Sequence, residues 1–225
     1  MANMKFYFTP GACSMGIHIL LEQLELVYEA YPVNLIKGEQ YRPEFLTINP
    51  KGSVPVLVLE DGSALTDFLV ISWWLAKSYP KAGLLTDSLE QEVAVIERIN
   101  YVVNTIHGQG FTRIFTTDKY RNRPDDDMKV KTEGRDIVER GLAVIDRQLA
   151  VEEMADRQIN IADAALFYVE FWAEKTDIPL PEHCRTHYQT LLQQPAVRQV
   201  LMEEGYHTTL LNQPLKNVGA GHATA

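Results

Sequence analysis

The sequence predicts two domains, an α+β domain over residues 1–80 and an all-helical bundle over residues 88–205. In the first domain, short β-prone runs alternate with helix-period segments in the order βαβ and then ββα. From residue 88 onward, strand patterns give way to long amphipathic ones. We therefore expect a linker over residues 81–87 and, because periodicity is lost there, a C-terminal tail over residues 206–225.

Local patterns predict each element of the first domain. The opening aromatic run is β-prone and stops at Pro10-Gly11, after which apolar residues recur at helical spacing. Asp61-Gly62 is typical of a hairpin turn, and Pro32 favours a strand end or a sheet edge. The expected elements are a strand at 6–8, a helix over 17–26, a strand over 27–33, a helical turn over 43–48, strands at 54–59 and 64–65, and a helix from 67 that ends before 80–83.

The second domain is predicted to be helical throughout. Its first helix carries apolar residues and His107 on one face, at alternating steps of four and three. Asn160, with Asp163 three residues later, has the spacing of a capping box and marks the start of a helix that is apolar on most sides and therefore central. The expected helices run over 89–107 with fraying through 113–123, over 125–149, from 160 to 172, over 187–193 and over 195–204.

Composition is that of an ordinary soluble globular protein. Of the 225 residues, 46% are hydrophobic and 23% are charged, and the formal net charge is −9. This negative charge argues against nucleic-acid partners and against binding to anionic membranes. Because the sequence has no run of about 20 apolar residues and no leader pattern at its start, we expect a cytoplasmic protein.

Cys13 lies at the junction between the first predicted strand and the first predicted helix. The unpaired N–H groups and the dipole at a helix start favour an anion, so we expect the pKa of this thiol to be lowered. The alternative is that Cys13 is a small buried hydrophobe. Gly16 occupies the position of a second cysteine in a Cys-x-x-Cys pair, so a redox cycle needs an external thiol. Cys184 is remote and neither cysteine has partners at metal-ligand spacing, so we expect two reduced thiols and no metal.

A set of short motifs, in order, resembles the cytosolic glutathione transferases and most of all the bacterial beta class. The resemblance covers about nine tenths of the chain and continues to Glu204-Gly205. It implies a thioredoxin-like first domain, glutathione as co-substrate and a homodimer. The matching motifs are Pro10-Gly11-Ala12-Cys13-Ser14, His18-Ile19, Ile48-Asn49-Pro50-Lys51-Gly52-Ser53-Val54-Pro55, Leu65-Thr66-Asp67, Asn100 through His107, and Ala162-Asp163-Ala164 with Leu166-Phe167.

The resemblance also implies roles for individual residues. Cys13, assisted by Ser14, matches the cysteine that lies against the glutathione sulfur, and His107 matches the histidine that faces the same sulfur. The alternative for His107 is a satisfied polar residue between packed domains. Val54 would clamp the cysteinyl part of glutathione through its backbone, ahead of a cis peptide bond to Pro55. The remaining glutathione contacts are expected from Lys37, Lys51, Ser53, Asp67, Phe68 and, across the dimer, Asn100.

Two departures from the family pattern predict weaker binding of glutathione. Asp67 is followed by Phe68, where the family has an acid followed by Ser or Gly, so only the backbone N–H of Phe68 is left as a donor there. Loss of one charge-assisted hydrogen bond weakens binding by roughly 1.5–3 kcal/mol. After His107, Gly108-Gln109 replaces a basic residue and adds one position.

The leading hypothesis is a glutathione transferase that conjugates glutathione to hydrophobic electrophiles, exchanges disulfides through Cys13, or does both. Its apolar substrate would contact a set of residues for which an ordinary core role is an equal alternative, namely Phe111, Ile114, Phe115, Tyr168 and Trp172. Two other functions stay open. One is a non-catalytic binding or regulatory protein with the transferase fold, and the other is a glutathione-dependent lyase or dehalogenase of aromatic compounds.

Overall fold

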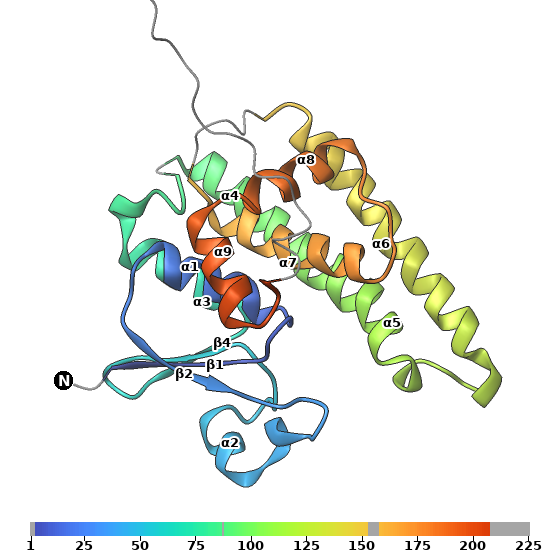
Figure 1. Ribbon diagram of the computed structural model, residues 1–225, viewed down its shortest axis with the longest axis horizontal. Helices are drawn as coiled ribbons and strands as arrows, with labels where there is room; N and C mark the ends of the chain where they lie inside the picture. Colours follow the sequence, from blue (N-terminus) through green and yellow to red (C-terminus); the bar gives the residue numbers. More distant parts are fainter. Residues whose placement is uncertain (1–2, 87, 153–157, 208–225) are drawn as a thin grey trace, which may run out of the picture.

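The computed structural model describes residues 3–86, 88–152 and 158–207. Figure 1 shows a four-stranded sheet with helices α1 and α3 on one face and α2 on the other. The helical domain stands against the face that carries α1 and α3. The predicted fold class, an α+β domain followed by a helical bundle, is confirmed.

The first domain has the predicted order of elements. The sheet order is β2-β1-β3-β4, with β1 parallel to β2 and antiparallel to β3, and with β3 antiparallel to β4. Pro32 ends the edge strand β2, as its missing N–H requires. The elements are β1 (Met4–Phe8), α1 (Ser14–Gln23), β2 (Tyr28–Pro32), η1 (Glu39–Tyr41), α2 (Pro43–Ile48), β3 (Val56–Val58), β4 (Ala64–Thr66), α3 (Phe68–Ser78) and η2 (Pro80–Ala82).

Several boundaries in this domain differ from the prediction by one to three residues, and two of these differences have a clear physical cause. Helix α1 ends at Gln23 instead of residue 26, because Glu25 takes a left-handed conformation with φ of 52°. Strand β3 starts at Val56 instead of residue 54, since Pro55 has no N–H to donate to a ladder.

The helical domain keeps the predicted helices but breaks the first one. Hydrogen bonding changes at Val102, so the helix expected over 89–107 is an α-helix followed by a π-helix. Such a segment absorbs one extra residue in a helix, which agrees with the added position after His107. The elements are α4 (Leu89–Tyr101), the π-helix η3 (Val102–Phe111), α5 (Thr112–Phe115), η4 (Thr117–Lys119), η5 (Pro124–Asp126), α6 (Asp127–Leu149), α7 (Ile161–Lys175), α8 (Glu182–Leu191) and α9 (Pro195–Glu203).

Helix α8 begins five residues before the predicted start at residue 187. The carboxylate of Asp146, on α6, accepts hydrogen bonds from the backbone N–H groups of His183 (2.7 Å) and Cys184 (3.0 Å). These are unpaired donors of a first helical turn, so the cap of α8 comes from another helix and leaves no local sequence signal.

Helix α7 is the centre of the second domain, as predicted. The Asn160 side chain accepts the N–H groups of Ala162 and Asp163, and Asp163 accepts the N–H of Asn160 in return, which confirms the capping box. Every residue of α7 from 161 to 173 is buried.

Residues at both ends of the helical domain are anchored. Leu84, within the expected linker, is 1% exposed, and its carbonyl accepts a hydrogen bond from the N–H of Ile161 (3.1 Å). Tyr206, expected in the tail, packs against Phe171 with ring centroids 5.0 Å apart. The rest of the expected tail, from residue 208, lies outside the described residues. Within the described ranges, every helix is too short or too polar to cross a membrane.

Candidate functional site

The turn between β1 and α1 carries Cys13, and the helical domain holds this turn in place. Glu204 accepts the backbone N–H of Gly11 through Oε2 (2.7 Å), and Trp172 donates Nε1–H to the Gly11 carbonyl (2.6 Å). Gly11 has a φ of +73°, and a Cβ there would lie 2.2 Å from the Tyr206 hydroxyl, so the position requires glycine. The position of the cysteine is therefore set by both domains.

Ser14 holds the same turn from inside the first domain. Its fully buried hydroxyl accepts the N–H of Thr9 and donates to the Thr9 carbonyl, both at 3.1 Å. These two hydrogen bonds link the end of β1 to the start of α1. Ser14 therefore fixes the turn that carries Cys13, and its assistance to the sulfur stays a prediction from the resemblance.

The expected ionisation of Cys13 is wrong for this structure. Burial raises the pKa of the Cys13 thiol to about 12, the backbone N–H groups of Cys13 and Ser14 lower it by less, and the charge of Asp67 raises it further. The helix-start effect acts in the predicted direction but is outweighed by desolvation. The thiol is protonated at neutral pH, and it donates to the Val54 carbonyl, with Sγ and oxygen 3.6 Å apart.

Val54 and Pro55 occupy the positions expected from the resemblance. The peptide bond between them is cis, which confirms the expectation. The preceding loop is held by the buried Asn49, whose side-chain amide donates to the carbonyl (2.8 Å) and the hydroxyl (3.3 Å) of Ser53. The Ser53 side chain is therefore engaged within the loop, and the Val54 carbonyl points at the thiol.

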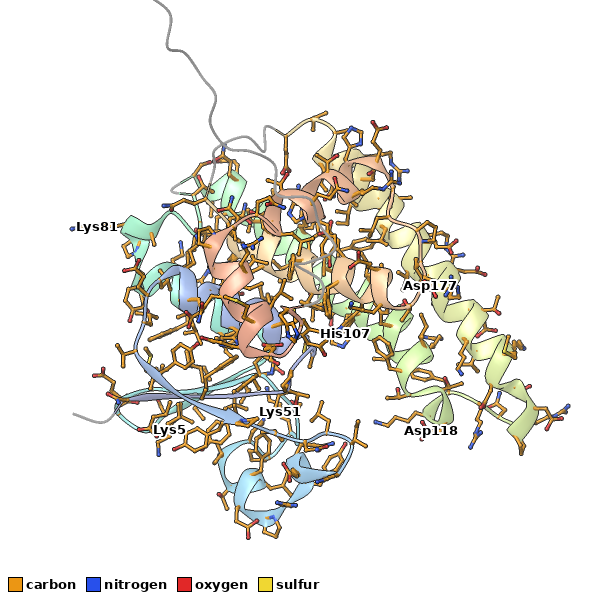
Figure 2. All side chains as sticks on the ribbon, viewed as in Figure 1. Lys5, Lys51, Lys81, His107, Asp118 and Asp177 are labelled. Atoms are coloured by element: carbon orange, nitrogen blue, oxygen red, sulfur yellow. The ribbon has the colours of Figure 1, made fainter. Side chains whose placement is uncertain are left out.

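His107 reaches the same region from the π-helix η3 (Figure 2). Its Nδ1 lies 3.3 Å from the Tyr168 hydroxyl, and its ring meets the Trp172 ring edge-on at 4.9 Å. Burial lowers the pKa of His107 to about 4, so the imidazole is neutral at physiological pH. Among the described residues, no hydrogen bond joins His107 to Cys13.

Tyr168 interacts with both His107 and Cys13. Burial raises the pKa of this phenol well above its ordinary value, and the charge of a Cys13 thiolate would raise it further. Tyr168 is fully buried, so it cannot form the wall of an open substrate site, as had been expected. The sequence prediction missed its link to His107, because nothing local indicates that these two residues meet.

Phe68 fills the space between α1 and α7. Its ring lies 5.5 Å from that of Tyr168, and a Cβ on Gly16 would come within 2.6 Å of it and within 2.4 Å of the Ala164 carbonyl. Glycine at position 16 therefore makes room for this ring. The phenyl group is buried, which leaves only the backbone of Phe68 at the start of α3, as predicted.

The polar residues expected to bind glutathione are only partly brought together. Lys51 forms an exposed ion pair with Asp67 and donates to the Thr66 hydroxyl (2.7 Å), beside the start of α3. Lys37 is exposed on a separate loop, where its backbone N–H is bonded to Asn34. Lys51 and Asp67 thus adjoin the Phe68 backbone, whereas Lys37 makes no hydrogen bond to them in the described ranges.

Asn100 lies in the last turn of α4, whereas His107 lies within the π-helix η3. Asn100 is exposed and accepts a hydrogen bond from Asn104 (2.6 Å). The wider turns of the π-helix rotate later residues away from the positions that α-helical spacing predicts.

The five residues expected to contact an apolar substrate differ in accessibility. Phe111 is fully buried and Trp172 is 8% exposed, whereas Phe115 is 51% exposed and Ile114 is partly buried. Phe115 stacks on Phe111 (5.6 Å) and meets Trp172 edge-on (5.3 Å). Phe115 and Ile114 are therefore the members of the set that a ligand can reach.

The sequence did not predict the hydrogen bonds that Glu204 and Trp172 make to the backbone of Gly11. These contacts join residues more than 160 positions apart, and Glu204 had entered only as part of the family motif. In the structure Glu204 is only 6% exposed, and this burial of a carboxylate at the end of a helix marks Glu204 as a residue with a structural role.

Comparisons with known proteins identify the family of this chain. The glutathione S-transferase N-terminal domain family matches residues 11–78. The chain is 33% identical to glutathione S-transferase GstA of Escherichia coli O157:H7 over 208 residues, which are 90% of this chain and 99% of that protein. Its structure resembles a glutathione S-transferase from Xylella fastidiosa (TM-score 0.81, 26% identity, 90% and 98% of the two chains) and a beta-class enzyme from Sphingomonas chungbukensis (0.74, 27%, 90% and 99%). The chain belongs to the glutathione S-transferase family.

Proposed function

We propose that this glutathione S-transferase conjugates glutathione to hydrophobic electrophiles, and that Cys13 acts as a neutral hydrogen-bond donor to the glutathione sulfur. The observation that carries the proposal is the thiol of Cys13, held 3.6 Å from the Val54 carbonyl. By family resemblance, that carbonyl receives the cysteinyl N–H of glutathione. A bound tripeptide would therefore take over the carbonyl and leave the S–H free to donate to the incoming sulfur.

The protonation state of Cys13 favours this role over nucleophilic attack. With a pKa of about 12, only about one thiol in 10⁵ is ionised at neutral pH. Disulfide exchange needs a thiolate as the attacking group, so the protein without ligand is poorly prepared for it. A neutral S–H next to an anionic sulfur, in contrast, forms a charge-assisted hydrogen bond.

The proposed reaction transfers the glutathionyl group to an electrophilic carbon. The glutathione thiol releases its proton to solvent, its sulfur attacks an activated aryl halide, a C–S bond forms, and the halide leaves with the electron pair of the broken bond. Cys13 keeps its proton throughout and lowers the energy of the thiolate. His107, with its pKa near 4, does not store the released proton, and we assign it to hydrogen bonding and shape, with Tyr168 fixing its ring.

Charged groups beside the start of α3 suit the ends of the tripeptide. Lys51 offers a cation to the glycyl carboxylate, Asp67 offers an anion to the γ-glutamyl amino group, and the Phe68 N–H faces the γ-glutamyl carboxylate. The Lys51–Asp67 ion pair is half exposed, so exchanging it for ligand contacts costs little. Lys37 and Ser53 stay predictions from the resemblance.

We also propose a homodimer of the beta class. Large apolar side chains stand exposed on neighbouring faces of α3 and α4, and a second copy of the chain would cover them. Asn100 borders a hollow on the same side, near Leu69, Val93 and Ile96, which suits its expected reach across a dimer. The exposed side chains are Val70 (48%), Trp73 (43%), Leu89 (69%) and Val93 (58%). Location in the cytoplasm stays a prediction from the sequence.

Activity with glutathione and an activated aryl chloride tests the role of Cys13. Cys13→Ala should lower kcat/KM about 10- to 100-fold, since a hydrogen bond to a charged group contributes about 1.5–3 kcal/mol. Cys13→Ser retains a donor and should keep activity within a few fold of the parent, and Cys184→Ala, at the other free cysteine, is the matched control.

Each alternative function has its own signature in this experiment. Equal loss of activity in Cys13→Ser and Cys13→Ala, with a mixed disulfide in the parent's mass spectrum after oxidised glutathione, would establish covalent exchange instead. Absence of turnover despite a thermal shift with millimolar glutathione would establish a binding protein. Release of halide without a stable thioether product would indicate a dehalogenase.

A further inference from the structure

An imidazole and two carboxylates converge where α9 packs against α1. Figure 1 shows these two helices next to each other. His18 and Glu22 are one turn apart on α1, and Glu203 is the last residue of α9. One ligand atom from each of these three side chains lies within 4.8 Å of the other two. Helical spacing of four residues places the first two on one face, as in known helical metal sites.

His18 is oriented as a metal-binding histidine is. It is 1% exposed, and its Nδ1 lies 2.9 Å from Oε1 of Glu204. Nε2 is 3.1 Å from Oε2 of Glu203, yet it makes no hydrogen bond to any described residue. With Nδ1–H donated to Glu204, the Nε2 lone pair faces the two carboxylates, and a carboxylate behind the ring is the usual outer partner of a metal-bound histidine.

We propose that His18, Glu22 and Glu203 bind a divalent transition-metal ion of the zinc type. One imidazole nitrogen and two carboxylate oxygens suit Zn²⁺, whereas Mg²⁺ and Ca²⁺ prefer sites made of oxygen alone. Glu203 is exposed and Glu22 is partly so, which leaves a fourth position for water.

The surrounding charges favour a cation at this point. Three carboxylates, those of Glu22, Glu203 and Glu204, face a single imidazole. The Tyr28 hydroxyl donates to Glu22 (2.5 Å) and helps to fix the position of this carboxylate. A doubly charged ion would balance the excess negative charge without breaking any of the existing hydrogen bonds.

The ion would tie the end of the helical domain to the first helix. Glu204 bonds to His18 with one oxygen and to the Gly11 N–H with the other, so the site adjoins the turn that carries Cys13. The sequence prediction of no metal rested on the spacing around the two cysteines, and Glu203 is too distant in sequence from His18 to be found by spacing.

Zinc binding to the untagged full chain, first stripped with a chelator, tests the site. Equilibrium dialysis with Zn²⁺ should give one ion per chain, and Tm should rise with zinc concentration. Glu22→Gln and Glu203→Gln should each weaken binding at least about tenfold, as loss of a ligand or its support does elsewhere. Glu139→Gln, which removes an exposed carboxylate from α6, is the matched control and should bind like the parent.

Two further readouts separate this site from the thiols and from simple ion pairing. In a Cys13→Ser background, Co²⁺ should still bind, and the His18 ring signals in NMR should shift on addition of Zn²⁺. The proposal is overturned if the parent binds no stoichiometric zinc, if both Gln variants bind as the control does, or if binding disappears with Cys13. None of these outcomes depends on whether the protein conjugates glutathione.

Discussion

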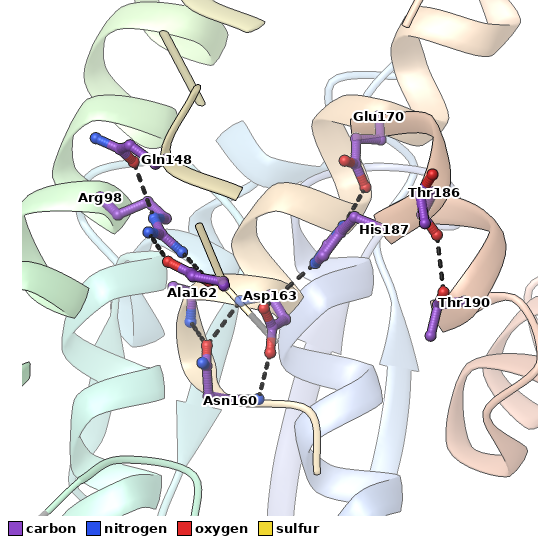
Figure 3. A network of polar contacts seen from close by, with 10 residues as sticks. Arg98, Gln148, Asn160, Ala162, Asp163, Glu170, Thr186, His187 and Thr190 are labelled. Carbon is purple, nitrogen blue, oxygen red and sulfur yellow. Dashed lines mark hydrogen bonds and ion pairs between the residues drawn. The ribbon is translucent and has the colours of Figure 1, made fainter. Parts of the chain in front are cut away.

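His107 and His187 lie in the same helical domain, the first partly buried and the second fully buried, yet they hold different charge states. Around His107 there are aromatic rings and a phenol, and burial lowers its pKa to about 4. His187 lies between Glu170 (2.8 Å) and Asp163 (3.3 Å), and these carboxylates raise its pKa to about 9 against the opposing effect of burial (Figure 3). Burial alone removes a charge, whereas burial with counter-charges keeps it.

This difference in charge state distinguishes a cluster that stabilises the fold, around His187, from a site suited to catalysis, around Cys13 and His107. The His187 cluster joins α7 to α8 through charges, and Asp163 also caps α7. Cys13 and His107 are both neutral, and single hydrogen bonds join them to Val54 and Tyr168, while the negative charge of Asp67 acts on Cys13. An incoming anionic sulfur would therefore meet two neutral side chains.

Removal of the buried cation should have the largest effect. His187→Gln removes the cation that lies between Asp163 and Glu170, so the free energy of unfolding should fall by about 3–5 kcal/mol. Urea unfolding measures it, with His183→Gln as a control: this half-exposed histidine on the same helix pairs with Asp146, and its replacement should cost less than about 1 kcal/mol. A fall of similar size in both variants would contradict the comparison.

The stability that His187 contributes should also depend on pH. Because its folded pKa lies above the ordinary 6.5, its contribution is complete below that pH and is lost as pH rises through about 9. The gap in unfolding free energy between the parent and His187→Gln should therefore shrink in this window. A gap that stays constant from neutral to alkaline pH would contradict the assigned charge.

His107 should show the opposite pH dependence. Its folded pKa is depressed, so the stability that it contributes is present above pH 6.5 and is lost as pH falls through about 4. The parent should lose roughly 2–3 kcal/mol relative to His107→Gln between these values. Urea unfolding at a series of acidic pH values measures this, and parallel profiles for the two proteins would show that His107 titrates normally.

The smallest expected effect belongs to the phenol beside His107. Tyr168→Phe removes one neutral hydrogen bond and leaves the ring packing intact, so stability should fall by about 0.5–1.5 kcal/mol. The Nδ1 and Nε2 signals of His107 in NMR should change, because the ring loses the partner that fixes its tautomer. Unchanged imidazole signals would indicate that the hydroxyl does not orient this histidine.

The same contrast explains what the sequence could predict. The turn ahead of α1 and the capping box at Asn160 depend on residues a few positions apart, so patterns identified them. The π-helix at Val102, the cap that Asp146 provides for α8 and the raised pKa of Cys13 depend on packing between distant segments. For Cys13, the local signal at the helix start was real but smaller than the desolvation that the second domain helps to impose.

The most direct test of the account is the ionisation of Cys13 in the protein without ligand. The rate of alkylation by iodoacetamide, followed across pH by mass spectrometry of the Cys13 peptide, reports the thiolate fraction. We expect little reaction at neutral pH and a rate still rising above pH 10, in keeping with a pKa of about 12. A plateau reached near neutral pH would show a lowered pKa and would contradict the claim that Cys13 is uncharged before glutathione binds.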